Sequence, residues 1–167
     1  QGLTFCDSTF AVFATEMAWL KLDVTTFSWQ EVLGGEGGHG MIIFSPRAVG
    51  RLESFTPPWP LLKIFKLTKK GKLIGGILCG ETINTPSMLC VADYLDALNW
   101  IDSIGGLCGA IARSEANLPV IREFADRTPW LSFLAQDSAT LSNTGVCLSL
   151  EADSDQVKEI IKLLKTE

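Results

Sequence analysis

Short apolar runs in the first third of the chain alternate with segments of helical spacing. The runs predict three strands, at Leu3–Cys6, Val24–Gln30 and Met41–Ser45. Between the first two strands, apolar side chains recur at helical spacing and predict a helix with one apolar face: Phe10, Phe13, Met17 and Leu20. Pro46 follows the third strand and suits the first turn of another helix, because that position needs no backbone N–H.

The middle of the chain carries clear turn and cap signals. The segment "LLKIFKLTKKGKLIGGILCG" alternates around a Lys-Lys-Gly turn and predicts a hairpin. Its five lysines could form an anion patch, but a solvated hairpin edge protected by charge is the favoured interpretation. Thr85 is a natural N-cap and Pro86 suits the first position of a helix that Gly105 ends. A second helix is predicted over Leu107–Arg127.

The last part of the chain predicts a strand over Thr144–Leu150, then a helix capped near Asp153 or Ser154. That helix has its apolar residues at i, i+3, i+4 and i+7: Val157, Ile160, Ile161 and Leu164. Interleaved strands and helices favour an α/β fold. The stretch after Gly106 is interpreted as a separate small α+β lobe, which divides the chain into residues 1–105 and 106–167.

Composition and charge limit the classes of protein. Hydrophobic residues make up 47% and charged residues 20%, which is typical of a soluble globular chain. The formal net charge of −5 argues against nucleic-acid binding, which needs a basic surface. No run approaches the roughly 18 apolar residues of a membrane span, and no signal peptide is visible. The opening "QGLTFCD" already predicts a strand, so we expect a piece of a longer chain.

The cysteines and the histidine offer little for a metal. The five cysteines are dispersed, no pair has C-x-x-C spacing, and His39 is the single histidine. We therefore expect no metal site. The apolar flanks of the cysteines predict buried free thiols in a reducing compartment, so a cytoplasmic location is expected.

Polar positions at the ends of predicted elements are candidates for chemistry. Asp7 is either the N-cap of the next helix or a carboxylate at the carboxyl edge of the sheet, where α/β proteins bind ligands. Asn84 and Thr85 either cap their helix or form a phosphate site with its free N–H groups. His39 is interpreted as structural, since no Ser/His/Asp or Cys/His set accompanies it.

A glycine-rich loop follows the second strand. Its segment "GEGGHG" formally matches the dinucleotide fingerprint G-x-G-x-x-G, which works because a helix follows it. Here the loop leads into the apolar strand "MIIFS", so we reject the dinucleotide interpretation. Glu31 stands at the mouth of this loop, a place where enzymes often put a reactive side chain.

Several long segments together resemble the phosphoserine aminotransferase family, within the class V pyridoxal-phosphate aminotransferases. They are "CDSTFAVFA", "VLGGEGGHGMIIFSPRAV", "PWPLLKIFKLTKKGKL", "GETINTPSMLCV" and "ATLSNTGVCL". The resemblance spans essentially the whole chain and corresponds to the C-terminal half of such an enzyme. It implies the aspartate-aminotransferase fold (fold type I), with residues 1–105 in the cofactor-binding large domain and residues 106–167 in a small C-terminal domain.

The resemblance also implies an activity and partners. Such enzymes are homodimers that use pyridoxal 5'-phosphate (PLP) and move an amino group between glutamate and 3-phosphohydroxypyruvate, giving phosphoserine for serine synthesis. Asp7 matches the aspartate that pairs with the pyridine nitrogen of the cofactor. A carboxylate there keeps this nitrogen protonated, so the cofactor ring can act as an electron sink. Gln30 matches a residue near the cofactor phosphate. Asn84 and Thr85 match residues that reach the phosphate of the neighbouring subunit's cofactor.

Two positions depart from the family pattern. Glu31 stands where the family has the lysine that holds PLP as a Schiff base, and a carboxylate cannot form an imine. Glu31 also adds a negative charge close to Asp7 and the cofactor phosphate, which is costly in a partly desolvated site. Leu141 stands where an arginine is expected to bind the substrate carboxylate, and leucine cannot make that bidentate contact. We therefore expect this chain to be inactive as a transaminase.

Two functions remain open from the sequence. The chain is either part of a phosphoserine aminotransferase by descent, or a catalytically dead remnant of the fold that acts as a binding or dimerisation module. Glu31 and Leu141 favour the second for this chain. A natural change, an engineered change and a sequence error would each place Glu31 and Leu141 at these two positions.

Overall fold

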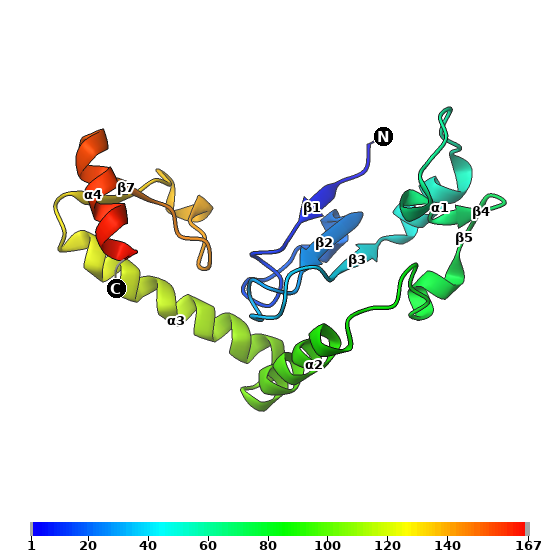
Figure 1. The fold of residues 1–167 in the computed structure, drawn as a ribbon, viewed down its shortest axis with the longest axis horizontal. Coiled ribbons are helices and arrows are strands. Elements are labelled where there is room, and N and C mark those ends of the chain that lie inside the picture. The colour runs from blue at the N-terminus through cyan, green and yellow to red at the C-terminus, as the bar shows by residue number, and fades with distance from the viewer. Residues whose placement is uncertain (1, 166–167) are drawn as a thin grey trace.

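The computed structural model describes residues 2–165, and its first sheet has three strands. These are β1, β2 and β3, at Phe5–Asp7, Val24–Ser28 and Gly40–Phe44. β2 lies in the middle, parallel to β1 and antiparallel to β3 (Figure 1). The three predicted strands are therefore present, with ends shifted by one or two residues.

The connection from β1 to β2 is a series of turns, so the α-helix predicted there is wrong. The carbonyl of Ser8 accepts from the amide of Ala11 at 2.9 Å, which starts a turn. Phe13 then has a φ of 67°, a left-handed value that interrupts helical hydrogen bonding. The connection ends in a single 3₁₀ turn, η1 (Trp19–Lys21). Leu20, on the predicted apolar face, is fully exposed, so the helical spacing did not reflect a shared buried face.

α1 and the hairpin β4–β5 follow β3 and contact each other. Ser45 caps α1 by accepting from the amide of Ala48 at 3.1 Å, and the helix begins at the proline predicted for its first turn. Lys70 and Gly71 have φ values of 53° and 73° and close the predicted hairpin. The elements of this part are α1 (Pro46–Ser54), η2 (Lys63–Phe65), β4 (Thr68–Lys69), β5 (Lys72–Leu73) and η3 (Gly75–Cys79).

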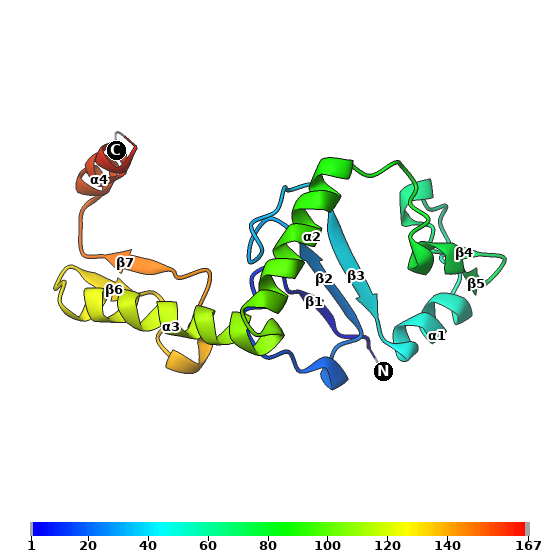
Figure 2. The ribbon, with the colours of Figure 1, turned by 90° about the horizontal axis from the view of Figure 1, so that it is seen from below.

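α2 (Met88–Ser103) lies across one face of the first sheet (Figure 2). Its N-cap is Ser87, whose hydroxyl accepts from the amide of Cys90 at 3.4 Å. The cap predicted at Thr85 is therefore wrong, and Pro86 precedes the cap instead of occupying the first turn.

The core lies between α2 and the sheet. Tyr94 of α2 stacks on Trp29 just after β2, with ring centroids 4.2 Å apart and planes 8° apart. The stack joins a cluster of buried and half-buried side chains: Val12, Phe27, Trp29, Phe13, Cys90, Val91 and Tyr94. Burial of these aromatic and aliphatic groups fixes α2 on the sheet.

α3 leads away from the sheet and carries a second group of elements at its far end (Figure 1). This group contains the antiparallel pair β6–β7. β6 was not predicted, and the strand predicted over Thr144–Leu150 is reduced to its last three residues. Of the two predicted caps of the last helix, Asp153 and Ser154, the structure has Asp153, which accepts from two amides at 2.9 Å. The elements are α3 (Gly106–Asp126), β6 (Leu131–Phe133), η4 (Ser138–Thr140), β7 (Leu148–Leu150) and α4 (Ser154–Leu164).

The five cysteines are free thiols, as predicted. Their predicted burial is wrong, because three of them are exposed and two are half-buried: Cys79, Cys108 and Cys147, then Cys6 and Cys90. Among residues 2–165, no helix combines the length and apolar character needed to cross a membrane.

Asp23 is a buried carboxylate that joins the first sheet to α1. It accepts from the amide of Thr4 at 2.8 Å and from the hydroxyl of Ser45 at 2.8 Å. Arg47 of α1 donates to it from Nε at 2.8 Å and also from a terminal nitrogen. The hydrogen bonds from Arg47, then that from Thr4, hold the pKa of Asp23 well below its usual range.

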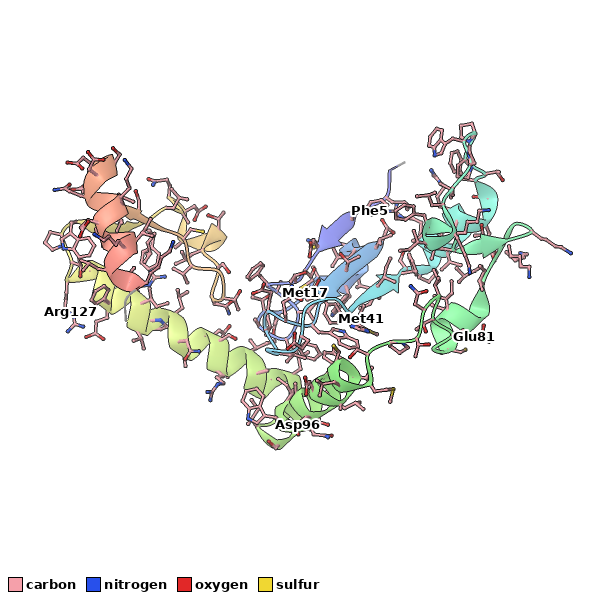
Figure 3. The ribbon with its side chains drawn as sticks, viewed as in Figure 1. Phe5, Met17, Met41, Glu81, Asp96 and Arg127 are labelled. Atoms are coloured by element: carbon pink, nitrogen blue, oxygen red, sulfur yellow. The ribbon has the colours of Figure 1, made fainter. Side chains whose placement is uncertain are left out.

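Asp23→Asn should lower the stability of the fold at neutral pH. Because the folded pKa is depressed, the carboxylate stabilises the protein above its unfolded pKa of about 3.9, and this contribution is lost as the pH falls below that value. We expect the difference between wild type and Asp23→Asn in urea unfolding to be large at pH 7 and to shrink at pH 3. Asp96→Asn, at an exposed position on the outer side of α2 (Figure 3), is the matched control. An equal loss of stability in Asp23→Asn at both pH values would contradict a stabilising role of the Asp23 carboxylate.

Candidate functional site

The candidate site lies where β1 and β2 end. Because the two strands are parallel, their carboxyl ends meet at the same edge of the sheet, the edge where α/β proteins bind ligands. Asp7 is the last residue of β1, and Gln30 and Glu31 follow the end of β2 at Ser28. The predicted sheet-edge position of Asp7 is confirmed. The alternative of a helix N-cap is wrong, since the connection from β1 to β2 contains no α-helix.

Asp7 is exposed and held in one orientation by Thr9. Its Oδ1 accepts from the Thr9 hydroxyl at 2.6 Å and from the Thr9 amide at 3.1 Å. These two bonds hold the pKa of Asp7 below its usual value, so the group is an anion at neutral pH. The Thr9 hydroxyl also accepts from the amide of Ser28 at 3.2 Å, which ties the ends of β1 and β2 together. Thr9 is thus a positioning residue that sequence reasoning did not single out.

The glycine-rich loop runs directly into β3, which agrees with rejecting the dinucleotide fingerprint. His39 in this loop stacks on Trp29, with ring centroids 5.3 Å apart. Its Nε2 accepts from the amide of Ser87 at 3.2 Å, immediately before α2. The prediction that His39 is structural fits this contact, because the ring links the loop to the start of a helix. Gly40 must lack a side chain, since a Cβ there would lie 2.7 Å from the carbonyl oxygen of Phe27.

Glu31 is exposed and lines two neighbouring clefts. The first, here called the sheet-edge cleft, has a volume of about 420 Å³ and is lined by Asp7, Thr9, Gln30, Glu31 and Ser142 among others. The second, here called the helix cleft, has a volume of about 380 Å³ and includes Arg113 of α3. The structure therefore brings the predicted residues Asp7, Gln30 and Glu31 together in one cleft. Two carboxylates in one cleft repel each other and disfavour an anionic ligand.

A loop far away in sequence closes both clefts. The Asn143 side-chain amide donates to the carbonyl of Ala14 at 2.8 Å, and the Thr144 hydroxyl donates to the carbonyl of Phe10 at 2.6 Å. These bonds dock residues 142–144 against the turn that follows β1. Leu141, just before them, is half-buried and lines neither cleft.

Asn84 and Thr85 lie outside this arrangement. Both are exposed, precede the N-cap of α2 and line neither cleft. The carbonyl of Asn84 accepts from the hydroxyl of Thr82 at 2.6 Å. A role for these two residues toward this chain's own clefts is not supported, which leaves the expected role toward a neighbouring subunit as a proposal.

The described residues contain no group of three or more metal-ligating side chains. Of the expected site residues, the structure thus groups Asp7, Gln30 and Glu31 beside Ser142. The clefts add two residues that were not predicted as site residues, Arg113 and Asn143, although Asn143 lies in the segment "ATLSNTGVCL" that resembles the family.

Comparison with known proteins identifies the relatives of this chain. No protein-family model matches it. The phosphoserine aminotransferase of Methanosarcina mazei is 54% identical over 167 residues, which are 100% of this chain and 45% of that protein. The chain is homologous to phosphoserine aminotransferases. It spans less than half the length of this relative, so the homology covers a part of such an enzyme.

Solved structures of phosphoserine aminotransferases share the fold. The crystal structure of the enzyme from Cytophaga hutchinsonii matches with a TM-score of 0.75 and 17% identity, over 98% of this chain and 44% of that one. The PLP-bound phosphoserine aminotransferase of Trichomonas vaginalis matches with a TM-score of 0.59 and 14% identity, over 98% of this chain and 54% of that one. These likenesses support an α/β fold that matches part of an aminotransferase, as predicted.

Proposed function

We propose that this chain is the C-terminal part of a phosphoserine aminotransferase by descent, in which covalent cofactor attachment has been lost. The parent reaction moves an amino group from glutamate to 3-phosphohydroxypyruvate in a PLP-dependent homodimer. Residues 1–105 would belong to the cofactor-binding large domain, and residues 106–167 would form the small C-terminal domain. The observation that carries the proposal is the cleft that gathers Asp7, Gln30 and Glu31 at the sheet edge.

Part of this cleft fits PLP. Asp7 is an ionised carboxylate fixed by Thr9, which suits a pairing with a protonated pyridine nitrogen. Gln30 offers an amide to the cofactor phosphate from the same cleft. Asn84 and Thr85 are proposed to reach the cofactor phosphate of a neighbouring subunit. When PLP is bound in such enzymes, it supplies the electron sink for amino transfer.

The other part of the cleft does not fit covalent PLP. At position 31 the family reaction requires an amine nucleophile, and Glu31 has only carboxylate oxygens. Its charge also stands in the same cleft as that of Asp7. Leu141 supplies no charged contact for a substrate carboxylate. We therefore propose no catalytic step for this chain.

A second candidate function is a non-catalytic binding or dimerisation module. The same two substitutions favour it, because they remove chemistry while the homology to the family extends over the whole chain. In this alternative the chain retains the fold of the family but does not catalyse its reaction.

Treatment with PLP followed by borohydride should leave no cofactor at residue 31 of the wild-type chain, because a carboxylate gives no reducible imine. Glu31→Lys should acquire an adduct at that position. Glu36→Lys, in the same glycine-rich loop but outside both clefts, controls for labelling of any exposed lysine. Peptide mapping by mass spectrometry distinguishes these results. Equal labelling of Glu31→Lys and Glu36→Lys would contradict the assignment of position 31.

A further inference from the structure

The sheet-edge cleft contains two negative side chains and no positive one. Asp7 and Glu31 are the charged residues among the described residues that line it. Both are exposed, so a ligand in the cleft can reach them. Neither forms an ion pair within residues 2–165. Two carboxylates without a counter-charge favour a ligand that brings two cationic hydrogen-bond donors.

Arg113 leaves the charge of Glu31 uncompensated. It is the one cationic side chain among the described residues that line the helix cleft, which Glu31 also lines. Its guanidinium carbon lies 5.5 Å from the centroid of the Trp100 ring, which is a cation–π contact. Arg113 and Glu31 form no ion pair with each other. The Glu31 carboxylate is therefore available to a ligand in the sheet-edge cleft.

The two carboxylates differ in their freedom. Asp7 is held by the hydroxyl and the amide of Thr9, which donate to its Oδ1 at 2.6 and 3.1 Å. A carboxylate held in one orientation suits a donor in the plane of a rigid ring, such as a protonated pyridine nitrogen. Glu31 has a longer side chain and no ion pair to hold it, so it suits a donor that can rotate.

The aldehyde and amine forms of the cofactor differ in the group opposite the pyridine nitrogen. In PLP this group is an aldehyde, whose oxygen only accepts hydrogen bonds. The Glu31 carboxylate also only accepts them, so the two cannot pair. In pyridoxamine 5'-phosphate the group is an aminomethyl ammonium, a rotatable cationic donor that pairs well with a carboxylate. The amine form also brings one more positive charge into a cleft that holds two negative ones.

We infer that the sheet-edge cleft binds pyridoxamine 5'-phosphate without a covalent bond and in preference to PLP. Glu31 accepts from the ammonium group, Asp7 accepts from the protonated pyridine nitrogen, and Gln30 contacts the phosphate. The cleft volume of about 420 Å³ accommodates this ligand. A lysine at position 31 would give the opposite preference, because its amine bonds to the aldehyde and its charge repels an ammonium. The inference rests on the proposed function, from which it takes the roles of Asp7 and Gln30.

Equilibrium dialysis of the full chain at neutral pH tests the preference. Two neutral analogues stand for PLP, whose aldehyde would react with exposed lysines: 4-deoxypyridoxine 5'-phosphate and pyridoxine 5'-phosphate. Pyridoxamine 5'-phosphate should bind at least about tenfold more tightly than either. Equal binding of the three ligands would overturn the inference and leave the proposed cofactor site in place. Absence of binding of all three up to about 1 mM would contradict both.

Variants assign the preference to Glu31. Glu31→Gln should weaken binding of pyridoxamine 5'-phosphate about tenfold and leave that of 4-deoxypyridoxine 5'-phosphate unchanged, because only the ammonium group contacts position 31. The unchanged analogue also shows that the variant is folded. Asp7→Asn should weaken all three ligands, which share the pyridine nitrogen. Glu36→Gln, in the same loop but outside both clefts, is the matched control. A preference that survives Glu31→Gln, or that Glu36→Gln removes, would overturn the inference.

Discussion

In a complete enzyme made by joining this chain to the N-terminal part of a related phosphoserine aminotransferase, the double variant Glu31→Lys/Leu141→Arg should turn over about 10²-fold faster than Glu31→Lys alone. The proposed roles explain the size of the effect. A lysine at position 31 would hold the cofactor, and an arginine at position 141 would orient the substrate on it. A bidentate contact to the substrate carboxylate contributes roughly 3 kcal/mol to transition-state binding.

The single variants show whether the two positions act as a unit. Glu31→Lys alone should restore cofactor attachment with weak turnover. Leu141→Arg alone should restore no turnover, because the enzyme with Glu31 has no attached cofactor on which the arginine could orient the substrate. Steady-state rates with phosphoserine and 2-oxoglutarate measure the series. Leu141→Lys in the Glu31→Lys background is a control, because a lysine restores charge without the bidentate geometry. Equal rates for Glu31→Lys and the double variant would show that an arginine at position 141 does not orient the substrate.

The isolated chain should self-associate at micromolar concentration. Its accessible surface is 12,267 Å², whereas a compact monomer of 18.2 kDa has roughly 8,100 Å². The excess includes large apolar side chains, with Phe5 71% exposed on β1 and Leu62 70% exposed before η2. β1 also pairs with β2 alone among the described strands, so its other edge is open to another chain.

Light scattering and sedimentation should therefore show oligomers or aggregates. A reducing buffer is the necessary control, because Cys79, Cys108 and Cys147 are exposed thiols that could cross-link copies. Phe5→Lys, which places a charge on the open edge strand, should reduce association. A monodisperse, cooperatively unfolding monomer at tens of micromolar would count against the view that this chain is normally covered by further polypeptide.

Local sequence signals predicted the parts of the fold that local interactions fix. Pro46 marked the start of α1, the Lys-Lys-Gly turn marked the β4–β5 hairpin, and Asp153 marked the cap of α4. Each of these features depends on residues within a few positions of one another, so the chain itself carries the information. The same holds for Asp7, whose place at the end of a strand could be predicted.

The features that were predicted wrongly or missed also have specific causes. The helix predicted after β1 rested on apolar spacing alone, and the turn at Phe13 overrides that spacing. Thr85 and Ser87 are both good caps, and the contact between the Ser87 amide and His39, 48 residues away, accompanies the choice of Ser87. Asn143 lies in the segment "ATLSNTGVCL" that resembles the family, but its place at the site depends on a bond to a residue 129 positions earlier, which spacing along the chain does not predict.

The proposed loss of activity is tested by measuring turnover of the complete joined enzyme with Glu31 and Leu141 unchanged. The assay follows phosphoserine-dependent conversion of 2-oxoglutarate to glutamate, with PLP in excess and the Glu31→Lys/Leu141→Arg enzyme as the positive control. We expect no conversion above that of PLP in buffer, because position 31 has no amine to hold the cofactor. Enzymatic turnover by the unchanged sequence would show that position 31 is not the reactive position.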